Sequence, residues 1–537
     1  MRHAPHRRLL EAAGRSSSNA PRVLTTRRRF QDYFVTHIPK SSLHPDSSNS
    51  SLLRRHLPGA IAKPHDDPES SSKRAPALDA SPDTATVRIP LRGAKHHFGA
   101  AVSRGSRPYN EDAYQAGVID IPAFAKRPPG SVTVKKARSS VVQHGGSSDP
   151  GSSVQEDQKD QDESTSESPS DPQTFYFGVF DGHGGVECSG FLSKGLHTYI
   201  EKAAKQYNLR STLQPPTPPA AGQQTDSGGA PEVDQTQLQS SLVSSWRQLV
   251  GGYFRRFAPV AFKDPSAPSI DTMLTYAFLC ADLDFIETQV RRMRSDSDPV
   301  RGDSPINVSD IHPHTFKPIL PGDQKPFKGG STCSVAFIST PTPTPFWNPA
   351  TSATLLTAHC GDTRILLSRV SDGAALPLTT NHHPSTPSEA TRLRRFATSL
   401  VTDSFGEERL AGVANTRAFG DIGSKSLGIV AEPELRTTDL GPGEYAFLCL
   451  VSDGVSGTMA DQEVVDVVKE AKTPEQGARD VVAYATEVSE DGDNATCLVV
   501  RLGGWERRQE GGGGSLGTKE GREWRRREAL DPRGRRT

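Results

Sequence analysis

Short apolar segments rich in β-branched and aromatic residues follow one another along this chain, with few helical stretches between them. In order they are FYFGVFD (175–181), STCSVAFI (331–338), ATLLTAHC (353–360), TRILLSRV (363–370), YAFLCLVSD (445–453) and NATCLVVRL (494–502). We expect strands there, with 353–360 and 363–370 joined as neighbours through Gly361-Asp362. Helical patterns cover 186–203 and 386–396, and Thr473 followed by Pro474 is typical of a helix start. Strands in runs favour an α+β fold with antiparallel sheets over a doubly wound parallel fold.

The pattern of strands and helices extends over 90–503, which we interpret as one domain. Three polar stretches interrupt it and are interpreted as long disordered insertions: 126–172, 205–236 and 293–327. Without them roughly 300 residues remain, which suits one large domain. The tail, 504–537, contains a GGGG run and many arginines, and we expect it to be flexible.

The N-terminal segment is basic. Its first 31 residues carry eight arginines and a single acid, Glu11. An Arg-rich, acid-poor start without a continuous apolar stretch is typical of a mitochondrial transit peptide. We therefore expect 1–45 to direct the protein to the mitochondrial matrix, with a basic arm that touches nucleic acid or membrane as the alternative. The Ser-, Pro- and Asp-rich residues 46–89 are interpreted as disordered linker.

The overall charge argues against a protein whose whole surface binds nucleic acid, because 63 basic residues are balanced by 63 acidic ones. Trp505 and Trp524 lie among arginines and could stack on bases, but acids interrupt that segment. Apolar runs such as 445–451 are far shorter than the ~20 residues of a membrane span, so none is expected. The six cysteines have no CxxC spacing, which predicts buried free thiols, a reducing compartment and no cysteine-bound zinc.

Several carboxylates lie at the ends of the expected strands or close to them. Asp181 and Asp453 each precede a glycine, Asp493 precedes the last strand, and Glu111 and Asp112 end the segment RPYNED. Carboxylates that converge at strand ends repel one another unless a cation neutralises them. Oxygen ligands without His or Cys favour Mg²⁺ or Mn²⁺ over zinc. A single Asp-Gly pair is better interpreted as a turn. The joint occurrence of several such carboxylates at strand ends favours a metal site.

Eight short motifs follow one another along the domain. They are RPYNED (107–112), VFDGHGG (179–185), GGSTC (329–333), HCGDTR (359–364), NTRAFGD (415–421), VAEPE (430–434), SDG (452–454) and DGDNAT (491–496). In this order they resemble the type-2C metal-dependent protein phosphatases, over roughly residues 95–502. The resemblance implies a sandwich of two antiparallel sheets flanked by helices. It also implies hydrolysis of phosphoserine and phosphothreonine on proteins, and we expect a monomeric, mitochondrial member of fungal type.

The resemblance further implies two Mg²⁺ or Mn²⁺ ions at the ends of the strands. Asp181 would bridge them, the Gly182 carbonyl would bind one, and Asp453 and Asp493 would bind the other. The acidic pair that ends RPYNED would reach a metal directly or through water: Glu111 and Asp112. Asp362 in HCGDTR would be a ligand of a weaker third metal.

Two further residues match catalytic positions of the family. Arg107 would bind the substrate phosphate through its guanidinium. The alternative is that Arg107 forms a surface ion pair with Glu111. His183 would be the general acid that protonates the leaving oxygen, with an ordinary turn histidine as the alternative.

The motifs also depart from the family pattern. Gly457 replaces an expected aspartate after SDG, which makes a third metal doubtful, and Asn381 replaces an acid in a segment that we interpret as structural. A phosphatase-like scaffold without catalysis is the competing interpretation. It is disfavoured because Asp181, Asp453 and Asp493 are all present.

Overall fold

The computed structural model describes a set of ranges within the 537-residue chain. They are 33–39, 84–90, 97–127, 171–214, 235–263, 269–295, 329–394, 400–402, 408–410, 414–508 and 515–530. Most of each expected insertion lies outside the described residues. Among the residues that are described, no helix is long and apolar enough to cross a bilayer.

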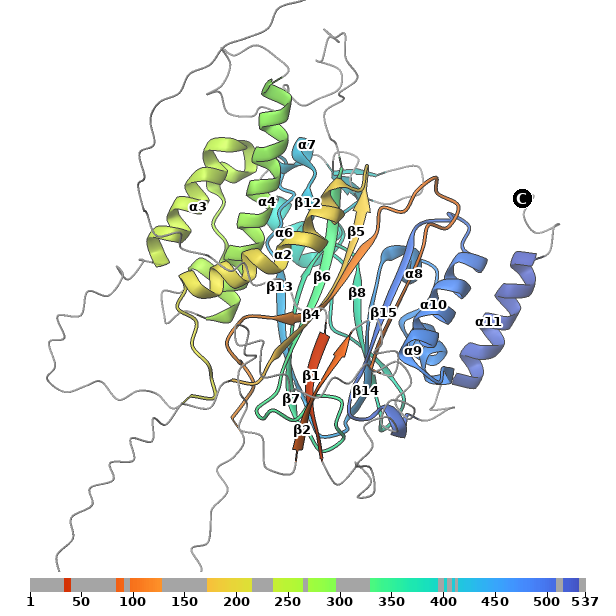
Figure 1. Ribbon diagram of the computed structural model, residues 1–537. Helices are drawn as coiled ribbons and strands as arrows, with labels where there is room; N and C mark the ends of the chain where they lie inside the picture. Colours follow the sequence, from red (N-terminus) through yellow and green to blue (C-terminus); the bar gives the residue numbers. More distant parts are fainter. Residues whose placement is uncertain are drawn as a thin grey trace, which may run out of the picture.

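Two antiparallel sheets form the centre of the domain (Figure 1). In the first sheet the strand order is β13 (Glu434–Leu440), β7 (Ala353–Cys360), β6 (Gly330–Ser339), β5 (Thr174–His183) and β4 (Ala113–Ile119), and the short β12 (Phe419–Gly420) pairs with β6. In the second sheet the order is β3 (Phe98–Ser103), β15 (Ala495–Arg501), β14 (Tyr445–Val451), β8 (Arg364–Arg369) and β9 (Ala375–Pro377). Every strand pair in both sheets is antiparallel.

One apolar core lies between the two sheets. It joins Phe177 and Val179 of β5 and Leu355 of β7 to Leu448 of β14 and Leu498 of β15. β5, β6 and β7 are buried on both faces, which explains why their sequences are continuous apolar runs rather than alternating ones. The expectation of an α+β sandwich of antiparallel sheets is confirmed.

Helices cover the outer face of each sheet (Figure 1). Against the first sheet lie α2 (Glu187–Gln206) and α4 (Ile270–Ser295), and then α3 (Gln235–Leu249) with the short η3 (Gly252–Arg256) and η4 (Val260–Phe262). Against the second lie α8 (Asp453–Ser456), α9 (Asp461–Glu470) and α10 (Pro474–Val488). The Thr473 side chain accepts a hydrogen bond from Gln476 N, so the predicted start of α10 is confirmed.

Two smaller helices, α6 (Pro387–Arg394) and α7 (Ile422–Lys425), lie near the edge of the first sheet where β12 pairs. Two short strands, β10 (Leu400–Thr402) and β11 (Glu408–Leu410), pair with each other. All six cysteines are free and five of them are buried.

The structure corrects three predictions. First, β7 and β8 are not paired neighbours: the chain crosses from one sheet to the other at Gly361-Asp362. Second, part of the expected tail is ordered, because Trp505 of η6 (Trp505–Arg507) is buried and α11 (Ser515–Leu530) packs on α9 and α10. Third, the linker expected at 46–89 contains most of β2 (Thr84–Pro90), which pairs with β1 (Tyr33–Pro39).

Candidate metal centre

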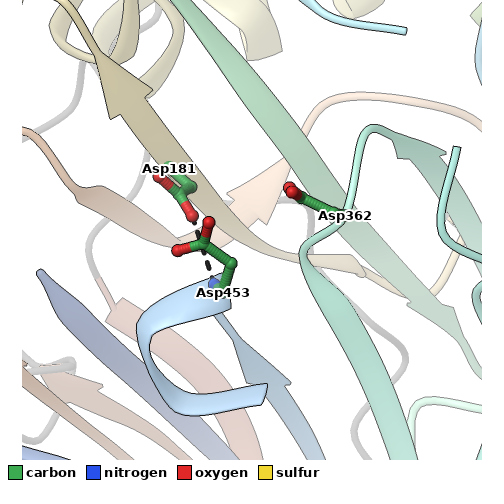
Figure 2. A group of neighbouring side chains, drawn as sticks. All are labelled: Asp181, Asp362 and Asp453. Carbon is green, nitrogen blue, oxygen red and sulfur yellow. Dashed lines mark hydrogen bonds between the residues drawn. The ribbon is translucent and has the colours of Figure 1, made fainter. Parts of the chain in front are cut away.

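Three of the predicted carboxylates come together where strands from both sheets end. Asp181 lies near the end of β5, Asp362 at the crossing between β7 and β8, and Asp453 at the start of α8, directly after β14. One carboxylate oxygen from each lies within 4.8 Å of the others. Figure 2 shows Asp181 and Asp453 side by side with Asp362 facing them, and Asp453 N donates a hydrogen bond to Asp181 Oδ2 at 3.2 Å.

The proximity of these carboxylates changes their proton affinity. Burial, followed by the charges of Asp453 and Asp112, raises the pKa of Asp181 well above its ordinary value. Burial and the neighbouring Asp362 raise the pKa of Asp453 to about 7. Like charges gathered out of water favour protons or a cation. The all-oxygen donor set fits a hard divalent cation.

Asp112 and Glu111 border this centre. Thr496 Oγ1 donates to Asp112 Oδ2 at 2.7 Å, and Asp112 Oδ1 is buried with no partner among the described residues. Burial raises the pKa of Asp112 to about 6. Glu111 Oε1 accepts a hydrogen bond from Gly185 N at 2.5 Å. An unpartnered buried carboxylate oxygen costs free energy, so its presence beside the aspartate cluster fits a cation site.

Gly182 is placed where a larger residue could not be. A Cβ at this position would lie 2.4 Å from the Glu111 carbonyl oxygen. The close approach of the two segments therefore requires glycine, and it brings the predicted ligands Gly182 and Glu111 next to each other.

Asp493 and Arg107 form an ion pair at the edge of the site. Arg107 Nη2 lies 2.9 Å from Asp493 Oδ2, with about half of the Arg107 side chain exposed. Asp493 is not one of the three clustered carboxylates, although its charge contributes to raising the pKa of both Asp112 and Asp453. The ion pair of Arg107 is therefore with Asp493, not with Glu111 as the alternative interpretation supposed.

Asn494 is a site residue that the sequence analysis missed. Its Oδ1 accepts from Glu111 N at 2.7 Å, and its Nδ2 donates to the carbonyls of Arg104 and Tyr109. These hydrogen bonds connect the segment that contains Arg107 and Glu111 to the loop of Asp493. Its place in DGDNAT, directly after a predicted ligand, was the available signal.

His183 lies at the last position of β5, and its partner was also missed. His183 Nε2 lies 2.9 Å from Asp421 Oδ1 and 3.0 Å from Oδ2. Burial lowers the pKa of His183, but the carboxylate of Asp421 outweighs it and raises the pKa to about 9. The position of Asp421 at the end of NTRAFGD was a signal that it belongs to the site, although nothing in the sequence pairs it with His183.

The family pattern predicts a second carboxylate near Asp362, at the position that Gly457 occupies. Asp362 instead contacts the side-chain amide of Asn415. Asn415 Nδ2 donates to Asp362 Oδ2 at 2.8 Å, while Asp362 Oδ1 is buried without a partner in the described part of the chain. Gly457 has no side chain to offer, and its N–H donates to the Asp453 carbonyl at 2.6 Å.

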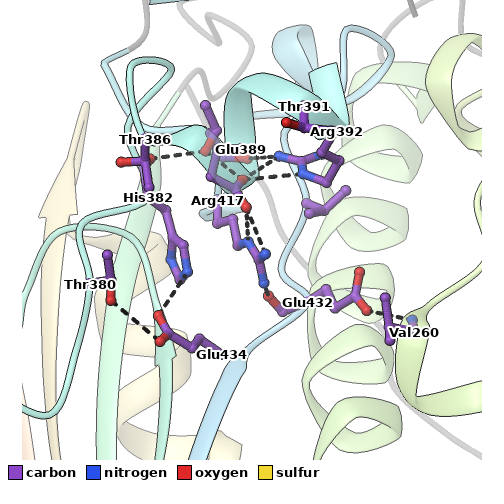
Figure 3. Close-up of polar contacts among 12 residues, drawn as sticks. Val260, Thr380, His382, Thr386, Glu389, Thr391, Arg392, Arg417, Glu432 and Glu434 are labelled. Carbon is purple, nitrogen blue, oxygen red and sulfur yellow. Dashed lines mark hydrogen bonds and ion pairs between the residues drawn. The ribbon is translucent and has the colours of Figure 1, made fainter. Parts of the chain in front are cut away.

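A network of polar contacts surrounds His382, Glu389 and Glu434 (Figure 3). Gly361 N donates to His382 Nδ1 at 3.0 Å, and His382 Nε2 lies 3.4 Å from Glu434 Oε2. Nearby, Glu389 accepts hydrogen bonds from both Arg392 and Arg417. Through His382, the segment that contains Asn381 is thus hydrogen-bonded to the loop of Asp362.

Comparison with known proteins shows the family of the chain. The family model described as protein phosphatase 2C matches residues 305–492. Protein phosphatase 2C homolog 4 of Schizosaccharomyces pombe is 33% identical over 341 residues, which cover 62% of this chain and 72% of that protein. The chain belongs to the protein phosphatase 2C family. It is a metal-dependent serine/threonine protein phosphatase.

Two further proteins are similar to this phosphatase over different lengths. Protein phosphatase 1K, mitochondrial, of Xenopus laevis is 32% identical over 152 residues, 28% of this chain and 40% of that protein. A crystal structure of serine-threonine phosphatase 2C from Toxoplasma gondii has a TM-score of 0.42 and 15% identity, and it covers 75% of this chain and 94% of that one.

Proposed function

We propose that this phosphatase hydrolyses phosphoserine and phosphothreonine in proteins at the carboxylate cluster, with two Mg²⁺ or Mn²⁺ ions bound there. The observation that carries the proposal is the convergence of Asp181, Asp362 and Asp453 within 4.8 Å. The unpartnered buried oxygen of Asp112 supports it. Two such ions supply a water of lowered pKa and stabilise charge on the phosphoryl group.

The ligands are those of the motifs: Asp181, the Gly182 carbonyl, Asp453 and Asp493, with Glu111 and Asp112 in contact directly or through water. Asp362 is the candidate ligand of a third ion, but Gly457 offers no second carboxylate there. Asp493 is included because its charge contributes to the raised pKa of both Asp112 and Asp453.

Arg107 binds the phosphate of the substrate in this proposal. A guanidinium has five N–H donors, and the ion pair with Asp493 uses Nη2. The half-exposed side chain can therefore stay anchored to Asp493 while its other N–H groups donate to phosphate oxygens. His183 supplies the proton that the leaving serine or threonine oxygen needs.

The experiment compares Arg107→Ala with Asp453→Asn on a phosphothreonine peptide. Asp453→Asn should abolish turnover with Mg²⁺ or Mn²⁺. Arg107→Ala should lower kcat/KM about 10- to 100-fold, because it removes charge-assisted hydrogen bonds to the substrate. Arg369→Ala, which removes an exposed arginine paired with Asp372, is the matched control. Near-normal turnover by Asp453→Asn, or undiminished wild-type turnover after exhaustive chelation, would refute the two-metal site.

We also propose that the protein acts as a monomer on phosphoproteins of the mitochondrial matrix. The eight arginines of the first 31 residues support this address, as does the mitochondrial name of the Xenopus relative. Because β1 begins at Tyr33, a reporter fused to residues 1–32 is the appropriate test. Retention of that reporter in the cytosol would contradict the proposal.

A further inference from the structure

Asp421 occupies a strained and enclosed turn between β12 and α7. Its backbone has a φ of 45°, in the left-handed region that residues other than glycine rarely adopt. Only 5% of the residue is exposed. Such conformations are unfavourable and persist where the surroundings determine them, often at functional sites.

The surroundings of Asp421 fix both its backbone and its side chain. Asp421 N donates to the Gly329 carbonyl at 3.1 Å. A Cβ on Gly330 would lie 2.5 Å from Asp421 Oδ2, so only glycine lets the carboxylate take this position. The preceding Gly420 N donates at 2.8 Å to Asp282 Oδ1, which comes from the buried face of α4.

The carboxylate so placed is directed at one ring nitrogen of His183. Both Asp421 oxygens lie within 3.0 Å of Nε2. His183 Nδ1 makes no hydrogen bond to the described residues, and 42% of the His183 side chain is exposed. A carboxylate that accepts from one imidazole nitrogen selects the tautomer in which that nitrogen has the proton.

We propose that Asp421 is the positioning residue of the general acid: it keeps the proton on His183 Nε2 and turns Nδ1 toward the leaving oxygen of the substrate. This rests on the proposed function of His183. The P–O bond breaks and its electron pair stays on the serine or threonine oxygen. That oxygen takes the proton from Nδ1, which leaves a neutral ring with Nε2–H still donated to Asp421. Asp421 itself gains no proton.

The test is a double-mutant cycle on two substrates with different leaving groups. Wild type, His183→Gln, Asp421→Ala and the double variant are compared on a phosphothreonine peptide and on p-nitrophenyl phosphate, whose leaving oxygen needs no proton. Asp421→Asn keeps an oxygen that can accept from Nε2–H. Asp372→Asn, at an exposed turn, is the control for an aspartate-to-asparagine change.

On the peptide, His183→Gln should lower kcat about 100-fold or more, and Asp421→Ala about 10- to 100-fold. The double variant should be no slower than His183→Gln, because Asp421 acts only through the ring. On p-nitrophenyl phosphate all should stay within about threefold of wild type. Asp421→Asn should recover most of the peptide activity.

A spectroscopic readout covers the possibility that Asp421→Ala folds poorly. Once the ring has been titrated to its neutral form at high pH, the ¹⁵N shifts of His183, assigned by difference from His183→Gln, should show Nε2–H in the metal-free wild-type protein and in Asp421→Asn. A neutral wild-type ring with its proton on Nδ1 would overturn the proposal.

The kinetic outcomes separate this inference from the proposed function. If His183→Gln slows the peptide selectively while Asp421→Ala slows both substrates equally, or adds to His183→Gln, the positioning role is wrong and the general acid remains. If His183→Gln itself slows both substrates equally, the general-acid role and this inference fail together. Metal-dependent phosphatase activity at the carboxylate cluster would still stand.

Discussion

His197 of α2 is a buried residue that makes the stability of the molecule depend on pH. Its side chain lies against β4, where Gln115 Nε2 is 2.9 Å from Nδ1. Burial lowers the pKa of His197 to about 4, whereas an unfolded chain has the ordinary value of about 6.5. Between these two pH values the unfolded state binds more protons than the folded state, so the free energy of unfolding falls as the pH falls.

We predict that His197→Gln flattens this pH dependence. A glutamine does not titrate, so the variant should lose less stability than wild type between pH 7 and pH 5. Urea unfolding at several pH values in this window measures the difference. His383→Gln, at a half-buried position, is the control and should follow wild type. Parallel curves for His197→Gln and wild type would contradict the assignment.

At the scale of elements, α11 is part of the folded domain. Arg522 and Arg526 form ion pairs with Glu470 and Glu487 at 2.9 and 2.7 Å. Thr518 Oγ1 donates at 2.6 Å to Asp466 Oδ2, and Asp466 also pairs with Lys469 in the interior of α9. The helix thus shields a buried ion pair.

Deleting α11 should therefore destabilise the domain. Truncation after residue 508 removes a hydrogen bond to the buried Asp466 carboxylate and several ion pairs, so we expect a loss of about 2–4 kcal/mol in the free energy of unfolding. Truncation after Leu530 leaves α11 intact and is the control. Chemical denaturation of both truncated proteins makes the comparison, and equal stability would show that α11 does not stabilise the domain.

The elements also show how far the sequence could predict the fold. Apolar runs located the strands because β5, β6, β7 and β14 are buried along their length. The crossing at Gly361-Asp362 was mistaken for a hairpin because an Asp-containing turn has the same local composition whether or not its strands pair. α11 was missed because a Gly- and Arg-rich composition is typical of flexible tails, and only contacts with α9 and α10 show that it packs.

The site could be predicted as a set of residues but not as a set of contacts. The motifs identified Asp181, Asp453 and His183, since strand-end carboxylates and a Gly-rich turn are local features. The pairing of Arg107 with Asp493 and of His183 with Asp421 joins positions hundreds of residues apart. Such pairs depend on the tertiary fold, and no local pattern shows them.

At the scale of the whole molecule, a buried ion pair joins the helical layer to the turn beside the candidate metal centre. Lys425 Nζ of α7 donates to Asp282 Oδ2 of α4 at 2.5 Å and to the Ala418 carbonyl at 2.8 Å. Both side chains are fully buried. The same Asp282 accepts from Gly420 N, so α4 holds the turn that contains Asp421.

We predict that Asp282→Asn costs about 3–5 kcal/mol of stability, because it leaves the ammonium of Lys425 buried without its charge partner. Adding Lys425→Met should recover part of this loss, since the unpaired charge is then removed while asparagine can still accept from Gly420. Asp284→Asn on the exposed side of α4 is the matched control. Thermal and chemical unfolding give the values, and a mild effect of Asp282→Asn alone would argue against this coupling.

The proposed function depends on divalent metal binding at the carboxylate cluster, and calorimetric titration of the metal-free, 537-residue protein with Mn²⁺ tests this most directly. Wild type should bind two ions, with proton release near pH 7 because burial and neighbouring charges raise the pKa of Asp453 to about 7. Asp181→Asn should lose both ions, whereas Asp372→Asn should bind as wild type does. Two ions bound equally well by Asp181→Asn and wild type would contradict the account.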